Sequence, residues 1–139
     1  MILIISDYHL NEKKVLSLIN YYNPEYVLCL GDGQSDNSFY EDNNIISVRG
    51  NCDTAELPIV LDFKYDNKNF LLTHGHYYDV VFGLTKLNFL ALEHHSNIVL
   101  YGHTHIQKIE EYDGIIFCNP GAIVDGNYAL YENGKIILK

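Results

Sequence analysis

Residues 2–9 read Ile-Leu-Ile-Ile-Ser-Asp-Tyr-His, a short apolar run that ends in an Asp-x-His motif. A continuous apolar run of this length is typical of a buried strand. Side chains at positions i and i+2 of an extended segment point the same way, so Asp7 and His9 are expected to reach one ion. The segment therefore predicts a buried strand that carries two metal ligands at its C-terminal end.

Four further polar clusters follow strand-like apolar runs. They are Gly31-Asp32-Gly33, Gly50-Asn51-Cys52-Asp53, His74-Gly75-His76 and Gly102-His103-Thr104-His105. Loops at strand ends are where α/β proteins gather catalytic groups, and glycine lets the backbone turn tightly and approach an ion. Five such clusters in one chain are hard to explain as turn chemistry, so they indicate one shared site.

The donor types narrow the chemistry of that site. Imidazole and carboxylate together suit zinc, manganese, iron, cobalt or nickel. The three cysteines lack paired spacing, which argues against a thiolate zinc site and against a disulfide framework. No Gly-rich loop ending in Lys-Ser/Thr is present, so a nucleoside triphosphate site of that kind is not indicated.

Length and composition fit one domain over residues 1–139, because a second domain would be too small to bury its own core. The chain is 47% hydrophobic and 19% charged, which is ordinary for a globular protein and excludes extensive disorder. No apolar run approaches the roughly 20 residues that a membrane span needs. The apolar N-terminal segment is short and lacks a basic leader, so we expect no signal peptide and a cytoplasmic protein.

The formal net charge of −9 restricts the partners. Non-specific binding of nucleic acid depends on lysine and arginine contacts to phosphates, so long nucleic acid is not an expected partner. Arg49 is the only arginine. The ligand is therefore expected to be small, or to be attracted by positive charge that side chains do not supply.

Short segments rich in β-branched residues alternate with two helical patterns in the first half, and strands fill the last third. Asp113-Gly114 and Asn133-Gly134 are hairpin turn signals. This pattern predicts sheets packed together with helices outside. The expected helices are Asn11–Tyr22 and Val80–His94. The expected strands are Ile2–Ser6, Tyr26–Leu30, Ile45–Val48, Ile59–Phe63, Phe70–Thr73, Ile98–Tyr101, Ile106–Glu110, Ile115–Cys118, Tyr128–Tyr131 and Ile136–Leu138.

The motifs Asp-x-His, Gly-Asp, Gly-Asn-x-Asp, His-Gly-His and Gly-His-Thr-His, in this order, resemble those of the calcineurin-like metallophosphoesterases. The resemblance covers residues 1 to about 121, and the Gly-Asn-Cys-Asp variant is most similar to the small YfcE-like phosphodiesterases. It implies an α/β fold, a four-layer α-β-β-α sandwich of two mixed sheets with two metals at the strand ends.

The resemblance also implies the role of each ligand. Asp7, His9 and His105 are expected to hold one divalent ion. Asn51, His74 and His103 are expected to hold the other, and Asp32 is expected to bridge both. Manganese is favoured, with zinc, iron, nickel or cobalt as alternatives. All seven positions carry the expected residue type, unlike the family's non-enzymatic branch, typified by the retromer scaffold subunit.

The implied activity is metal-dependent hydrolysis of a small phosphoester by a metal-bound hydroxide. A phosphodiesterase is favoured, because Cys52 occupies the position where larger relatives carry a histidine that protonates the leaving group. The alternatives are a phosphomonoesterase and a metal-binding interaction module without turnover.

Several residues near the motifs allow more than one interpretation. Cys52 is either a weak general acid or, as favoured, a small packing residue, and Asp53 is expected to orient a neighbouring histidine. His76 either contacts substrate, supplies the missing proton, or lies on the surface. Arg49 either clamps a phosphate or points away. The chain departs from the family pattern at Leu10, at Asn119-Pro120-Gly121-Ala122 and at Asp125-Gly126-Asn127, and His94 and His95 are expected to form a solvated helix end.

Overall fold

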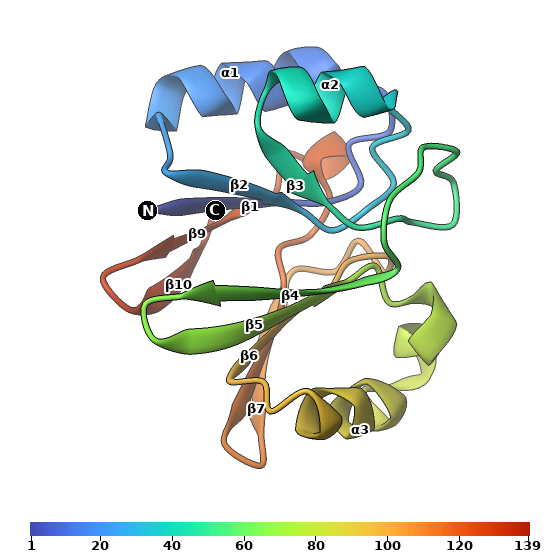
Figure 1. Ribbon diagram of the computed structural model, residues 1–139, viewed down its shortest axis with the longest axis vertical. Helices are drawn as coiled ribbons and strands as arrows, with labels where there is room; N and C mark the ends of the chain where they lie inside the picture. The colour runs from blue at the N-terminus through green and yellow to red at the C-terminus, as the bar shows by residue number, and fades with distance from the viewer.

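Two five-stranded mixed sheets pack against each other in the computed structural model, which describes residues 1–139 (Figure 1). In the first sheet β1, β2 and β3 run parallel, β9 is antiparallel to β1, and β10 is antiparallel to β9. Its order is β10 (Lys135–Leu138), β9 (Ala129–Glu132), β1 (Ile2–Ile5), β2 (Tyr26–Cys29) and β3 (Ile45–Ser47).

The second sheet has a parallel centre with an antiparallel strand on each edge. Strands β5, β6 and β8 are parallel, and β4 and β7 pair with them in the opposite direction. Its order is β4 (Val60–Tyr65), β5 (Lys68–Thr73), β6 (Ile98–Leu100), β8 (Ile115–Asn119) and β7 (Lys108–Tyr112).

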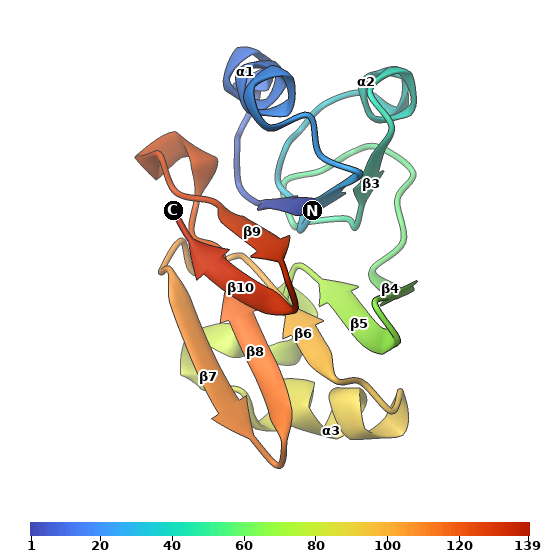
Figure 2. The same ribbon diagram turned by 90° about the vertical axis from the view of Figure 1, so that its left-hand side faces the viewer.

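Helices cover the outer face of each sheet (Figure 2). Helices α1 (Glu12–Tyr22) and α2 (Asn37–Asp42) lie over the first sheet, and α3 (Thr85–Glu93) lies over the second. The expected four-layer α-β-β-α sandwich is confirmed. None of these helices has the length and apolar content to cross a membrane.

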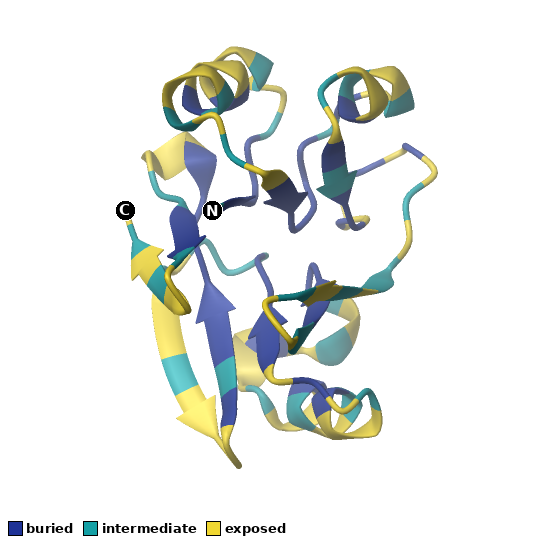
Figure 3. Ribbon diagram, turned by 60° about the vertical axis from the view of Figure 1, so that its left-hand side comes forward, coloured by how far each residue is buried: buried dark blue, intermediate teal, exposed yellow.

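Three apolar cores lie between the four layers, and Figure 3 shows buried central strands beneath helices that are exposed on their outer faces. Alternate residues of β1 serve two of these cores. Ile2 and Ile4 pack between the sheets, whereas Leu3 and Ile5 pack beneath α1 and α2. This double burial explains the continuous apolar run at the start of the chain.

All ten expected strands are present, with ends that differ by at most two residues from those expected. Both hairpin turns are confirmed. Asp113 and Gly114 have φ of 52° and 76°, and Asn133 and Gly134 have φ of 54° and 75°. Positive φ at both central residues matches the twist of the flanking strands.

The helix at residues 11–22 is confirmed, with the Asn11 side chain accepting a hydrogen bond from the Lys14 amide at 3.2 Å. The prediction of a helix over Val80–His94 is wrong for its first turn. Val80–Phe82 form a 3₁₀ turn, and Gly83, at φ 119°, interrupts the helical path before α3 begins at Thr85. Helix α2 was not expected, because its six residues are too few to produce a helical repeat.

Candidate metal centre

Five loops carry the expected ligands, and each follows the C-terminal end of a parallel strand. Strands β1, β2 and β3 supply three loops from the first sheet, and β5 and β6 supply two from the second. Asp7 contacts His105 across the two sheets, and Asp32 likewise contacts His74. Packing of the sheets therefore brings both sets of loops to one place.

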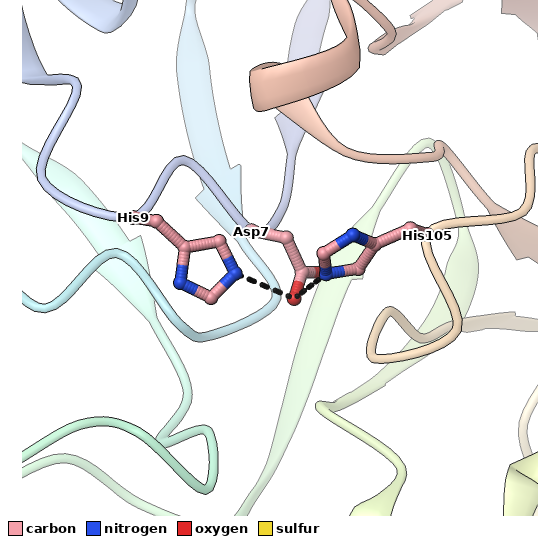
Figure 4. Close-up of side chains that lie close together, drawn as sticks. All are labelled: Asp7, His9 and His105. Atoms are coloured by element: carbon pink, nitrogen blue, oxygen red, sulfur yellow. Dashed lines mark hydrogen bonds and ion pairs between the residues drawn. The ribbon is translucent and has the colours of Figure 1, made fainter.

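Asp7, His9 and His105 form the first group of donors (Figure 4). Asp7 is fully buried, and its Oδ2 accepts hydrogen bonds from the Ser6 hydroxyl and the His103 amide. Its Oδ1 lies 3.1 Å from His105 Nε2 and 3.7 Å from His9 Nε2. One carboxylate oxygen is thus tied to the protein, while the other faces two imidazoles in an arrangement that suits a cation.

Asp32, His74 and His103 form the second group. The fully buried His74 places Nδ1 2.6 Å from the Leu30 carbonyl, so Nδ1 donates to that carbonyl and Nε2 is the nitrogen that faces the site. Nε2 has no hydrogen-bond partner, and it lies 3.1 Å from Asp32 Oδ2 and 3.9 Å from Asp7 Oδ1. A buried imidazole nitrogen facing two carboxylates fits a bound divalent cation, which would satisfy all three groups.

The ligand loops adopt unusual backbone conformations, so the expectation that Asp7 and His9 converge from an extended segment is wrong. Both residues have a positive φ, in the left-handed region of the backbone. The Asp7 backbone amide donates to the Gly31 carbonyl and the His9 backbone amide donates to the Asp32 carbonyl, so their loop is bonded to the loop that carries Asp32. Such φ values in non-glycine residues cluster at functional sites. The five expected ligands with positive φ are Asp7 (54°), His9 (40°), Asp32 (56°), His103 (70°) and His105 (63°).

Two glycines allow the loops to approach one another. A Cβ at Gly31, whose φ is 98°, would lie 2.7 Å from Nδ1 of His74. A Cβ at Gly102 would lie 2.1 Å from the Ser6 hydroxyl oxygen, beside Asp7. Any side chain at either position would push a ligand away, which is why the motifs carry glycine there.

In the second group, the Asp32 carboxylate and the His74 imidazole shift each other's pKa. Burial by itself raises the pKa of Asp32, but the His74 ring and the Cys52 amide outweigh it and hold that pKa at about 2. Burial lowers the pKa of His74, but Asp32 and Asp7 outweigh it and raise that pKa above its usual value. In the metal-free protein the buried carboxylates therefore favour the protonated form of His74.

Metal binding is expected to strengthen with rising pH, because His74 must lose that proton before Nε2 binds an ion. In the metal-free protein the raised pKa of His74 contributes stability that is present below its unfolded value and lost as pH rises through its folded value. The melting temperature gained with manganese should therefore grow from about pH 6 to about pH 8. Thermal unfolding with and without manganese measures it, and a gain that shrinks over this range would contradict the prediction.

Gln34 was not anticipated from the sequence, although it directly follows the Gly-Asp-Gly motif. Its Oε1 lies 2.9 Å from His9 Nδ1, so the amide fixes that nitrogen as the donor and leaves Nε2 for a metal. The backbone N–H of Gln34 donates to Asp53 Oδ1 at 2.8 Å.

Replacing Gln34 with alanine is expected to weaken manganese binding about 10- to 100-fold, the usual effect of losing a partner of a metal-bound histidine. Gln34 is only half-buried, so the melting temperature of the metal-free protein should change little. Calorimetric titration measures the affinity, and Asn20→Ala on the exposed face of α1 is the control. Unchanged affinity in Gln34→Ala would show that this hydrogen bond does not position His9.

Asp53 makes no hydrogen bond to a histidine, so it does not orient one directly. Its buried carboxylate accepts hydrogen bonds from the backbone amides of Asp32 at 2.8 Å, Gln34 at 2.8 Å and Gly50 at 2.7 Å. Asp53 therefore fixes the loop that carries Asp32 against its own loop. A carboxylate three residues after a glycine can satisfy local amides in this way, a signal that the sequence does contain.

Asn51 and Cys52 are both exposed, and the Asn51 amide lies 3.5 Å from Cys52 Sγ. The interpretation of Cys52 as a packing residue is wrong, because an exposed thiol fills no core. Its backbone amide donates to Asp32 Oδ1 at 2.8 Å, which keeps this loop beside the site. The role of Asn51 as a ligand stays a prediction.

His76 lies among the ligands, so it is not a remote surface histidine. Its ring centroid is 5.4 Å from that of His74 and 6.1 Å from that of His103. Nδ1 of His76 is buried without a hydrogen-bond partner. Burial and the neighbouring His74 lower its pKa, so the ring is neutral at neutral pH. Its part in substrate contact or proton transfer stays a prediction.

The remaining candidates lie at the edge of the site or outside it. Arg49 is exposed, and its Nε donates to the Asp53 carbonyl at 3.4 Å. His94 pairs with Asp62 at 3.0 Å, away from the ligands, and His95 is exposed. Asn119 donates from Nδ2 to the Gly102 carbonyl and to Thr104 Oγ1, so it supports the loop that carries His103 and His105.

Comparison with known proteins identifies the arrangement. A family model described as "Calcineurin-like phosphoesterase superfamily domain" matches residues 1–132. The chain is similar to the "Probable metallophosphoesterase" of Mycoplasma pneumoniae, at 30% identity over 125 residues that cover 88% of this chain and 78% of that protein. It is also similar to a phosphodiesterase of Methanocaldococcus jannaschii, at 32% identity over an alignment of 140 positions that covers 85% of this chain and 81% of that protein.

The solved structures agree with this assignment. A Streptococcus pneumoniae protein described as a predicted phosphoesterase superposes with a TM-score of 0.80 at 31% identity, covering 88% of this chain and 72% of that one. The family model spans nearly the whole chain and includes every expected metal ligand. This chain therefore belongs to the calcineurin-like phosphoesterase superfamily.

Proposed function

We propose that this protein is a phosphodiesterase that depends on two divalent metal ions and acts on small phosphodiesters. The observation that carries the proposal is the position of Asp32. Its carboxylate lies within 4.8 Å of the donor atoms of His74 and His103, and within the same distance of His9 from the first group. A carboxylate that reaches both groups supports the proposal that two ions share it.

The residues present divide into two ligand sets. Asp7, His9 and His105 would hold one ion, and His74, His103 and Asn51 would hold the other, with Asp32 between them. When bound, two such ions ionise a water near neutral pH and stabilise charge on phosphoryl oxygens. The positive charge of the two ions exceeds the negative charge of Asp7 and Asp32, so the loaded site attracts a phosphate despite the net charge of −9.

The side chains near the ligands favour diesters with good leaving groups. Burial, and then the nearby Asp32 carboxylate, raise the pKa of the Cys52 thiol, which makes it a poor proton donor. His76 is neutral at neutral pH, as described above. Because neither group is a strong acid, the leaving alcohol must depart with little help, which an activated diester tolerates best.

Hydrolysis of bis-p-nitrophenyl phosphate and p-nitrophenyl phosphate in the presence of manganese tests the proposal. We expect manganese-dependent turnover of both compounds, with the diester faster. No metal-dependent turnover of either compound would overturn the enzymatic function and favour a metal-binding interaction module. Faster cleavage of the monoester would reassign the protein as a phosphomonoesterase.

Metal stoichiometry provides a separate test of the dinuclear centre. Elemental analysis of protein dialysed against excess manganese should give two ions per chain. One ion per chain under these conditions would contradict the shared role of Asp32, whatever the turnover.

A further inference from the structure

Cys52 stands at the open side of the metal centre. Its side chain is exposed, whereas the neighbouring Asp32 is buried. The Cys52 amide donates to Asp32 Oδ1 at 2.8 Å, so backbone bonding holds this residue against the carboxylate. The Cys52 sulfur, a His9 ring nitrogen and an Asp32 oxygen all lie within 4.8 Å of one another. A thiol from outside the seven expected ligands thus converges with two of them, His9 and Asp32.

The sulfur gives this cluster a different metal preference from the rest of the site. Thiolate and imidazole suit zinc and softer ions such as cadmium, whereas manganese prefers oxygen ligands. None of the seven ligands assigned to the dinuclear centre is a sulfur. Cys29 and Cys118 are buried in the apolar cores and join no group of donors, so Cys52 is the one thiol able to contribute.

We propose that Cys52 is a ligand for thiophilic divalent ions and that Cys52, His9 and Asp32 together form a binding position for zinc or cadmium. On binding, a bond forms between the ion and Sγ, and the thiol proton passes to water. Because His9 Nδ1 is hydrogen-bonded to Gln34, only Nε2 of His9 is available to a metal, and one nitrogen binds one ion at a time. An ion held by Cys52 therefore removes His9 from the group that it forms with Asp7 and His105.

This competition has a functional consequence. Zinc or cadmium bound to Cys52 is expected to inhibit manganese-dependent turnover by diverting His9 and Asp32 from their places in the dinuclear centre. The inhibition rests on the proposed phosphodiesterase function, whereas the binding of a thiophilic ion to Cys52 does not.

Ultraviolet absorption of the thiolate-to-cadmium charge-transfer band tests the binding directly. Reduced, metal-free protein is titrated with cadmium chloride, and the same titration is made with Cys52→Ser, which keeps the size of the side chain. Titration with manganese is the control that should give no band. The band should appear in the unmodified protein and be lost in Cys52→Ser, with cadmium affinity about tenfold lower or more by calorimetry. A band of equal intensity in both proteins, or cadmium binding without any band, would overturn the proposal.

Inhibition is measured separately on bis-p-nitrophenyl phosphate, with each protein compared with its own rate in manganese alone. We expect Cys52→Ser to need about tenfold more cadmium for the same fractional inhibition. Equal sensitivity of both proteins would overturn the competition for His9. If neither protein turns over substrate, the proposed function fails, while the charge-transfer band still decides whether Cys52 binds the ion.

Discussion

Replacing Asp32 with asparagine is expected to reduce manganese-dependent turnover of bis-p-nitrophenyl phosphate by about 1000-fold. Asparagine keeps the shape of the side chain but removes the negative charge that faces donors of both groups. Metal ions supply several kcal/mol of transition-state stabilisation, and each 1.4 kcal/mol corresponds to about tenfold in rate. Loss of the shared carboxylate should also lower the manganese content from two ions per chain to one or none.

Asp36→Asn is the matched control for this change. Asp36 lies four residues further along the same loop, is exposed, and makes no side-chain hydrogen bond at the start of α2. The Asp36→Asn variant loses the same charge outside the site, so its turnover and manganese content should equal those of the unmodified protein. Rates and metal contents in Asp32→Asn close to those of the control would show that Asp32 is not the shared ligand.

Replacing Asp53 with asparagine is expected to cost about 2–4 kcal/mol of stability, because hydrogen bonds to a charged group contribute about 1.5–3 kcal/mol each. The amide of asparagine has one acceptor oxygen, so its nitrogen would face a backbone N–H that Asp53 now satisfies. Thermal unfolding in the presence of a chelator should show a melting temperature lower by roughly 10 °C. Manganese affinity should also fall about 10- to 100-fold, because the backbone of Asp32 and Gln34 loses its anchor.

Asp42→Asn, at the exposed end of α2, controls for the loss of one negative charge. Affinity is measured by calorimetry well below the melting temperature of the variant, so that a loss of binding is not a loss of folded protein. A large fall in melting temperature with unchanged affinity would mean that Asp53 stabilises the loop without positioning Asp32.

Local patterns in the sequence were sufficient to predict most of the framework. The runs Ile2–Ile5 and Ile98–Leu100 identify strands because every residue in them is buried, which leaves a continuous apolar signal within three or four residues. Asp113-Gly114 and Asn133-Gly134 predict hairpins because the required φ is a property of the residue itself. Short irregular elements such as α2 have no comparable local signal.

In the site, too, some residues could be predicted from local patterns and others could not. Motif order identified the donor types and the seven expected ligands, since those residues follow strands in a recognisable spacing. The positioning residues were missed or misread, because their partners lie far away in the chain. Gln34 bonds to His9 across 25 residues, and Asp53 bonds to the Asp32 amide across 21 residues. No pattern within one motif records such a contact.

The segment at residues 2–9 shows what each level decides. The sequence by itself determined that a buried strand ends in Asp7 and His9, because burial and donor type are local properties of these residues. Only the tertiary structure decided how the two side chains converge, through a left-handed backbone bonded to the loop of Asp32 and through His105 from the other sheet. Those contacts depend on how two sheets pack, and the free energy that holds the strained ligands in place comes from the whole fold.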